Sequence, residues 1–251
     1  MKRLGIDINE VLRFMSAKFY ECYMKEFGFD GIPENPYVFD FFSAYKWSGT
    51  TESIKYLKEI EDMVDDINPI YYQPDQFGNA PADYLLFNKK EKIKLSPKEV
   101  FNRFLYQDYI LEIFAGSSLM YKGFDLQFKN FYLHFKDKFE IVIISKENFF
   151  SIPLTLSFLA LLRSNVSKYV FTETYEDAWN NCDILITANP ELLTNIPEGK
   201  LVIKILKPFN AKIKADLEAI YITDFSPLKE GEEDENIIAN NKYNEFIEYT
   251  K

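Results

Sequence analysis

The stretch "RLGIDINEVLR" at residues 3–13 decides how the rest of the chain is interpreted. A short apolar run leads to Asp7, and two residues later an amide, Asn9, follows. We interpret residues 3–8 as a buried first strand, because a short apolar run of this kind is typical of a central parallel strand. An aspartate at the end of such a strand lies where α/β sheets bind their ligands. The stretch therefore predicts an α/β fold with Asp7 at its binding edge.

The second half of the chain alternates between strand-like and helix-like segments. Strands are predicted over residues 139–145, 168–171, 182–188, 200–206 and 219–223. This alternation favours a doubly wound parallel sheet, in which helices connect successive strands. The fold class we predict is α/β with a Rossmann-like core.

A largely helical segment separates the first strand from the others. Helices are predicted over residues 10–29, 50–67 and 96–116, the last with a capping box formed by Ser96 and Glu99. This placement predicts a mainly helical cap inserted after the first strand. We divide the chain into an α/β core (1–12 and 116–226), a helical cap (13–115), and an acidic linker with a C-terminal helix (227–251).

Composition restricts the classes of function. The chain has 251 residues, of which 47% are hydrophobic, and its formal net charge is −10, which disfavours generic nucleic-acid binding. Its cysteines, Cys22 and Cys182, are far apart, and its one histidine, His134, rules out a multi-histidine metal site. The longest apolar run, 151–162, is too short to span a bilayer. We expect a cytoplasmic protein that does not bind membranes.

A second polar residue follows a buried strand. Ser145 comes directly after "FEIVII" (139–144), as Asp7 comes after "RLGI". A carboxylate at one strand end and a hydroxyl at the next suit phosphoryl transfer, in which the carboxylate attacks phosphorus and the hydroxyl holds a phosphate oxygen.

Four short motifs together resemble those of a known superfamily. They are "GIDINEVLR" (5–13), "IVIISKEN" (141–148), "CDILITANPELL" (182–193) and "KPFN" (207–210). This pattern is similar to the haloacid dehalogenase (HAD) superfamily, and specifically to its 5′(3′)-deoxyribonucleotidase-like branch. The resemblance implies a Rossmann-like core, a helical cap, and magnesium-dependent phosphate hydrolysis through an aspartyl-phosphate.

The resemblance assigns roles to Asp7, Asn9 and Ser145. Asp7 matches the family's nucleophile and magnesium ligand, and Ser145 matches its phosphate-binding hydroxyl. Asn9 stands where the family has the aspartate that acts as general acid. An amide has no proton to give, so a contribution of about 10²–10⁴-fold to the rate is lost.

The remaining family groups are displaced or missing. The helix that normally supplies a phosphate-balancing lysine has none, and Lys146 and Lys168 are the nearest substitutes. Thr187 and Ala188 stand where acidic residues would hold magnesium, while Asp183 opens the same strand. Asp7 and Asp183 are the candidate metal ligands, and we expect no cofactor, or Mg²⁺ if the protein is active.

The hypothesis is a catalytically degenerate HAD-fold protein that binds a phosphorylated small molecule or nucleotide, or that serves as an assembly subunit. The alternative is a magnesium-dependent, 5′-nucleotidase-like phosphomonoesterase with displaced catalytic groups. A third hypothesis is an interaction module that uses the aromatic-rich segment "NPYVFDFFSAYKW" (35–47). Asp7 and Ser145 also fit a plain structural role as helix or turn caps.

The helix predicted at 151–162 bears on assembly. It is apolar on nearly every face, so its outer face needs a cover. That cover is either the inserted segment or a protein partner, including a second copy of the chain.

Overall fold

The computed structural model describes residues 1–29, 31–47, 95–163, 166–227 and 237–251. The helix predicted at 50–67 and the acidic run at 228–236 lie outside the described residues. Within them, a six-stranded parallel sheet has the order β3-β2-β1-β4-β5-β6. The strands are β1 (Arg3–Asp7), β2 (Glu140–Lys146), β3 (Tyr169–Thr172), β4 (Ile184–Thr187), β5 (Leu201–Ile205) and β6 (Glu218–Ala219).

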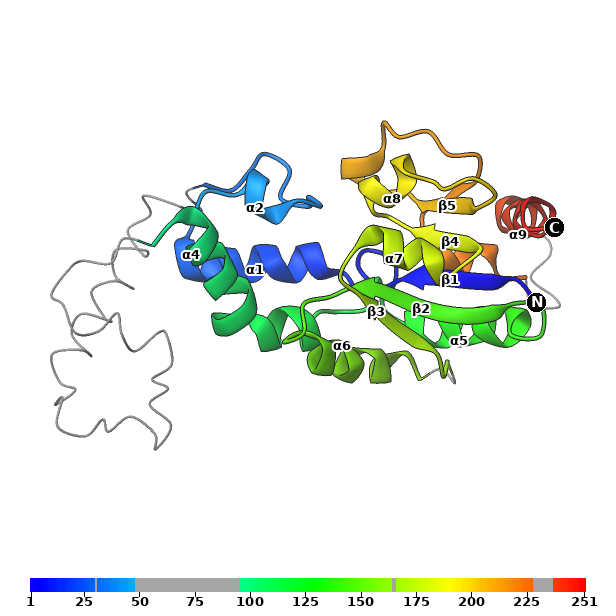
Figure 1. Cartoon of the computed structure of the whole chain (residues 1–251), viewed down its shortest axis with the longest axis horizontal. Coiled ribbons are helices and arrows are strands. Elements are labelled where there is room, and N and C mark those ends of the chain that lie inside the picture. The colour runs from blue at the N-terminus through cyan, green and yellow to red at the C-terminus, as the bar shows by residue number, and fades with distance from the viewer. Residues whose placement is uncertain (30, 48–94, 164–165, 228–236) are drawn as a thin grey trace, which may run out of the picture.

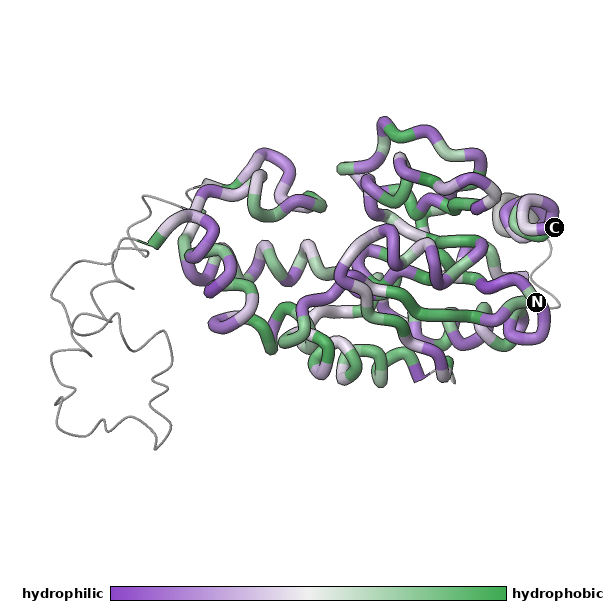
Figure 2. The backbone as a smooth tube through the Cα atoms, viewed as in Figure 1, coloured by the Kyte–Doolittle hydropathy of each residue, from purple (hydrophilic) through white to green (hydrophobic). Residues whose placement is uncertain are grey.

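Helices cover both faces of this sheet (Figure 1). One face packs on α5 (Phe124–Phe135), α6 (Ile152–Leu159) and α9 (Ile237–Tyr249). The other face packs on α7 (Tyr175–Asn180) and α8 (Pro190–Thr194). The strands between these layers are predominantly hydrophobic (Figure 2). The predicted class, a doubly wound α/β sheet, is confirmed.

The first strand of the chain is a central strand of the sheet. Arg3 pairs with Glu140 of β2, and Leu4 pairs with Ile184 of β4. Gly5 permits this close packing, because a Cβ atom there would lie 2.8 Å from the side chains of Cys182 and Ile144. Asp7 is thereby held at the carboxyl end of β1, between β2 and β4.

The described residues between β1 and β2 are largely helical. They contain α1 (Met15–Phe27), α2 (Phe41–Ala44), α4 (Pro97–Arg103) and the π-helical turns η3 (Phe104–Asp108) and η4 (Leu111–Ala115). These elements share their own aromatic cluster, in which Phe19, Tyr23, Trp47 and Phe104 are buried against one another. Much of the aromatic-rich segment 35–47 therefore packs inside the insertion.

Two elements differ from the sequence prediction. The helix predicted over 96–116 is α-helical only to Arg103 and continues as η3 and η4. The strand predicted over 219–223 is wrong: β6 pairs only two residues with β5, and the chain then forms the 3₁₀ turn η7 (Ile222–Phe225). This turn places Ile222 and Phe225 in the core. Two further 3₁₀ turns are η5 (Ala160–Leu162) and η6 (Pro208–Asn210).

The C-terminal helix α9 packs on the core. Its Phe246 is buried against Phe131, Phe135 and Phe225. The chain ends also meet, because Lys2 Nζ donates hydrogen bonds to the carbonyls of Thr250 and Lys251. Across the described residues, no helix has both the length and the apolar character needed to cross a membrane.

Candidate functional site

Asp7 lies at the carboxyl edge of the sheet with both carboxylate oxygens bonded within the protein. The backbone N–H of Ile8 donates to Oδ1 at 2.8 Å, and the Thr187 hydroxyl donates to Oδ2 at 2.7 Å. Thr187 is the last residue of β4, and its Oγ1 also accepts a hydrogen bond from the Asn189 N–H. The end of β4, where the sequence resemblance implied metal ligands, therefore presents a neutral hydroxyl to Asp7.

The pKa of Asp7 is raised from 3.8 to about 6. Burial is the largest cause, and the negative charge of Glu147 acts in the same direction. The hydrogen bonds from Thr187 and Ile8 oppose this rise without cancelling it. A buried carboxylate loses its hydration by water, which disfavours its charged form. Binding a proton removes the charge and so relieves this cost.

Asn9 is bound by a buried arginine. Its Oδ1 accepts hydrogen bonds from both Nε (2.9 Å) and Nη2 (2.6 Å) of Arg13. The Arg13 side chain is 0% exposed and lies 5.2 Å and 5.4 Å from the ring centroids of Phe114 and Phe158. Asn9, which the sequence resemblance aligned with a general acid, thus binds a buried guanidinium.

Glu147 is the anionic partner of Arg13. Its Oε1 lies 2.7 Å from Arg13 Nη2 and accepts hydrogen bonds from the hydroxyls of Ser145 and Thr155, each at 3.1 Å. The Ser151 hydroxyl donates to Oε2. We call Asn9, Arg13, Ser145, Glu147, Ser151 and Thr155 the Arg13 network. Ser145, the candidate phosphate ligand, directs its hydroxyl proton into this network.

Glu10, the acid next to Asn9, bonds to the start of α1. Its backbone has a left-handed φ of 63°, and its buried carboxylate accepts a hydrogen bond from the Ser16 N–H at 2.7 Å. Burial raises the pKa of Glu10, while the nearby positive charge of Lys207 acts in the opposite direction. The side chain therefore stabilises the start of α1, and it is not directed to Asp7.

Lys146 ends β2 at the same edge as Asp7, and its side chain is exposed. Its Nζ lies 4.1 Å from the ring centroid of Tyr175, the first residue of α7. Burial raises the pKa of Tyr175 to about 12, and the charge of Asp7 contributes to that rise. Lys146 thus provides an accessible positive charge at the carboxyl edge of the sheet.

Lys168 and Asp183 lie at the opposite edge. Lys168 Nζ pairs with Glu140 at 2.6 Å, at the start of β2. Asp183 accepts the Arg3 N–H at 2.8 Å and pairs with Lys200, and the backbone bond is the main cause of its lowered pKa. The structure brings Asp7, Asn9 and Ser145 to one edge, with Lys146 beside them, and it leaves Lys168 and Asp183 outside that group.

The donor set does not fit a magnesium site. Among the residues that the structure describes, no group of three or more His, Cys, Asp or Glu side chains could hold a metal ion. Asp7 shares its edge with Glu147, whose carboxylate is already paired with Arg13. Mg²⁺ prefers carboxylate oxygens, and Thr187 offers a neutral one instead.

Sequence reasoning placed Asp7, Asn9 and Ser145 and missed Arg13 and Glu147. A signal for each was present: Arg13 interrupts the apolar run "VLRFM" (11–15), and Glu147 follows a buried strand by one residue. A charge inside an apolar run points to a buried ionic partner. The identity of that partner becomes visible only in three dimensions.

The described part of the chain is thus an α/β protein with a six-stranded parallel sheet and a polar group at its carboxyl edge. No protein-family model matches the chain, and no curated protein matches it. A solved structure described as "Crystal Structure analysis of a Dehalogenase" aligns with 87% of this chain and 92% of its own, at 11% identity and a TM-score of 0.42. A TM-score this low carries no argument about activity.

Proposed function

We propose that this protein is a catalytically degenerate member of the HAD-like fold that binds a phosphorylated small molecule, such as a nucleotide, without hydrolysing it. The binding side is the carboxyl edge of the sheet, where Lys146 is exposed. Lys146 supplies positive charge for a phosphate group, and Tyr175 beside it supplies an aromatic surface.

One observation carries this proposal: Arg13 binds both Asn9 and Glu147. The amide that stands in place of the general acid and the acid nearest to Ser145 are therefore used to hold a structural cation. Asp7 retains the nucleophile's position, but its oxygens are bonded to Thr187 and Ile8. A leaving group would receive no proton from this arrangement.

The first experiment measures hydrolysis of an aryl phosphate with and without Mg²⁺. We expect the wild-type protein to hydrolyse the aryl phosphate no faster than Asp7→Asn does, because both proteins lack a general acid. A magnesium-dependent rate that is lost in Asp7→Asn would instead establish the alternative, a phosphomonoesterase.

The second experiment measures thermal stabilisation by nucleoside monophosphates and by inorganic phosphate. At 100 times the dissociation constant, a ligand raises the Tm by about 5–10 °C for a chain of this size. We expect Lys146→Glu to abolish the shift and Lys168→Glu to retain it. The two variants make the same charge change at opposite edges of the sheet. Equal shifts in both variants would contradict binding at this edge.

A further inference from the structure

Thr172, the last residue of β3, carries a buried hydroxyl. The residue is 5% exposed, and no group among the residues that the structure describes hydrogen-bonds with its Oγ1. Burying a hydroxyl without a partner is unfavourable, and nearly all buried polar groups in folded proteins are bonded. An unused donor at the carboxyl edge of a parallel sheet points to a ligand, because that edge is where such sheets bind them.

Lys146 is the neighbour of Thr172 across the ladder between β2 and β3. The two residues pair in register. They also lie on the same face of the sheet, because the residues two positions earlier, Ile144 and Val170, both pack in the cluster that contains α7. Adjacent strands are ~4.8 Å apart, so the two side chains begin side by side. Lys146 is exposed, and its Nζ lies 4.1 Å from the ring centroid of Tyr175.

The junction between β1 and β2 offers less to a phosphate group. Ser145 is 1% exposed there, and its hydroxyl donates to Glu147. Asp7 has a pKa of about 6, so it is mostly ionised near neutral pH and repels an anion. Thr172 lies two strands from β1, roughly 10 Å, where this repulsion is weaker. The available donor and the electrostatics both favour the junction between β2 and β3.

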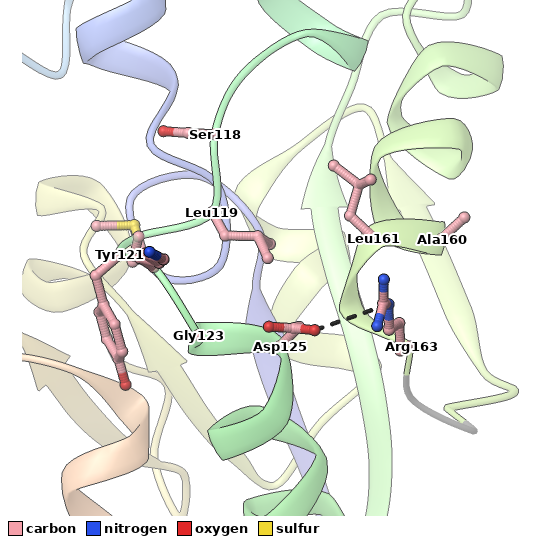
Figure 3. A pocket seen from close by; sticks show the side chains of 10 residues that line it. Ser118, Leu119, Tyr121, Gly123, Asp125, Ala160, Leu161 and Arg163 are labelled. Carbon is pink, nitrogen blue, oxygen red and sulfur yellow. Dashed lines mark ion pairs between the residues drawn. The ribbon is translucent and has the colours of Figure 1, made fainter.

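A second region with an exposed cation is less suited to an anion. Figure 3 shows a groove of about 840 Å³ whose lining includes Leu119, Leu161 and Arg163. Arg163 Nε lies 3.8 Å from a carboxylate oxygen of Asp125, which also lines the groove. An anion bound there would compete with that carboxylate. Lys146 contacts an aromatic ring instead of a carboxylate.

We propose that the phosphate group binds between β2 and β3, where Lys146 supplies positive charge and the Thr172 hydroxyl donates a hydrogen bond to a phosphate oxygen. This inference rests on the proposed function and names a further binding residue for its site. The Thr172 hydroxyl is buried, so the Lys146 side chain moves from the Tyr175 ring towards the phosphate as the ligand enters. Exposed side chains change rotamer within nanoseconds, so this movement does not limit binding.

Titration calorimetry with inorganic phosphate and with a nucleoside monophosphate tests the assignment. We expect Thr172→Val to weaken the binding of both ligands about 10–100-fold, because a hydrogen bond to a charged group is lost. Thr172→Ser keeps the hydroxyl and should bind as the wild type does. Ser226→Ala is the matched control: it removes another buried hydroxyl without a partner, after η7 and beyond β6, the edge strand opposite β3. That variant should bind both ligands as tightly as the wild type.

The melting temperature without ligand separates a binding role from a structural one. Thr172→Val should melt at or above the wild-type Tm, since it removes a hydroxyl that the fold does not use. A lowered Tm that Thr172→Ser restores would show a structural hydrogen bond and overturn the inference. Binding that depends on Lys146 but is unchanged in Thr172→Val would also overturn it, while the proposed function would stand. A wild type that binds neither ligand would overturn both.

Discussion

Arg13 shows how one residue can define the character of a site. Its guanidinium is fully buried and donates to Asn9, Glu147, Thr155 and the carbonyl of Phe114. A buried ion pair gives little net stability, but removing one partner leaves an uncompensated charge. Replacing a single charged residue of the Arg13 network is therefore expected to destabilise the fold.

Replacing Arg13 by alanine should lower the free energy of unfolding by about 3–5 kcal/mol, because Glu147 would be left buried without its cation. Urea denaturation followed by circular dichroism measures this loss. Arg163→Ala is the control, since this exposed arginine is expected to contribute less than about 0.5 kcal/mol. Similar effects from the two substitutions would show that the Arg13 network is not a structural unit.

The raised pKa of Asp7 predicts that the free energy of unfolding depends on pH. Its folded pKa of about 6 lies above the ordinary value of 3.8, so the folded state binds this proton more tightly than the unfolded state. Its contribution is therefore most favourable below pH 4 and is lost as the pH rises through 6. Asp7→Asn should flatten this part of the profile and raise stability at pH 7 by about 2–3 kcal/mol.

Chemical denaturation between pH 4 and pH 8 checks this expectation. Asp183→Asn is the contrasting control, because the folded-state pKa of Asp183 is lowered and its ionised form stabilises the protein. That variant should lose stability at pH 7. If Asp7→Asn also lost stability at pH 7, the carboxylate would have a favourable partner that the observed contacts do not provide.

The sequence predicts those site residues that lie at the ends of strands. Asp7 and Ser145 each end an apolar run, and parallel strands bring such ends to one edge. The bond between Arg13 and Glu147 joins residues 134 positions apart, so local pattern could not reveal it. The charges of both residues were visible in the sequence, but their pairing was not.

At the scale of elements, burial determined which predictions were confirmed. The runs that form β1, β2, β4 and β5 are apolar because both sides of the sheet are covered, and each was predicted. Near β6 the run "AIYIT" (219–223) has the same appearance, yet its last apolar residues reach the core through a turn. A local run of apolar residues indicates that those residues are buried. It does not indicate whether a strand or a turn carries them into the core.

Phe246 tests how much α9 contributes to the core. Its ring is fully buried among Phe131, Phe135 and Phe225. Phe246→Ala should lower the free energy of unfolding by about 3–5 kcal/mol, since it removes a large buried side chain and leaves a cavity. Glu245→Ala, one residue earlier and exposed, is the control in the same denaturation experiment. A small effect would mean that the core closes without α9.

At the scale of the whole molecule, two hydrophobic cores meet where the chain leaves the sheet and returns. The Phe14 N–H donates to the carbonyl of Ser118 at 2.9 Å, and Arg13 Nη1 donates to that of Phe114 at the same distance. These bonds join the segment that leaves β1 to the segment that returns to the sheet. The aromatic cluster of the insertion is thereby anchored to the edge of the sheet that we propose as the binding side.

The sheet order also has a consequence for synthesis of the protein. The central strand β1 is made before either of its partners, which begin at Glu140 on one side and at Ile184 on the other. Translation proceeds at about 5–20 residues per second, so this apolar strand waits roughly 7–27 s before β2 is made. Nascent chains stopped before residue 140 should therefore be sensitive to protease and dependent on chaperones, and resistance should appear only once β4 has left the exit tunnel.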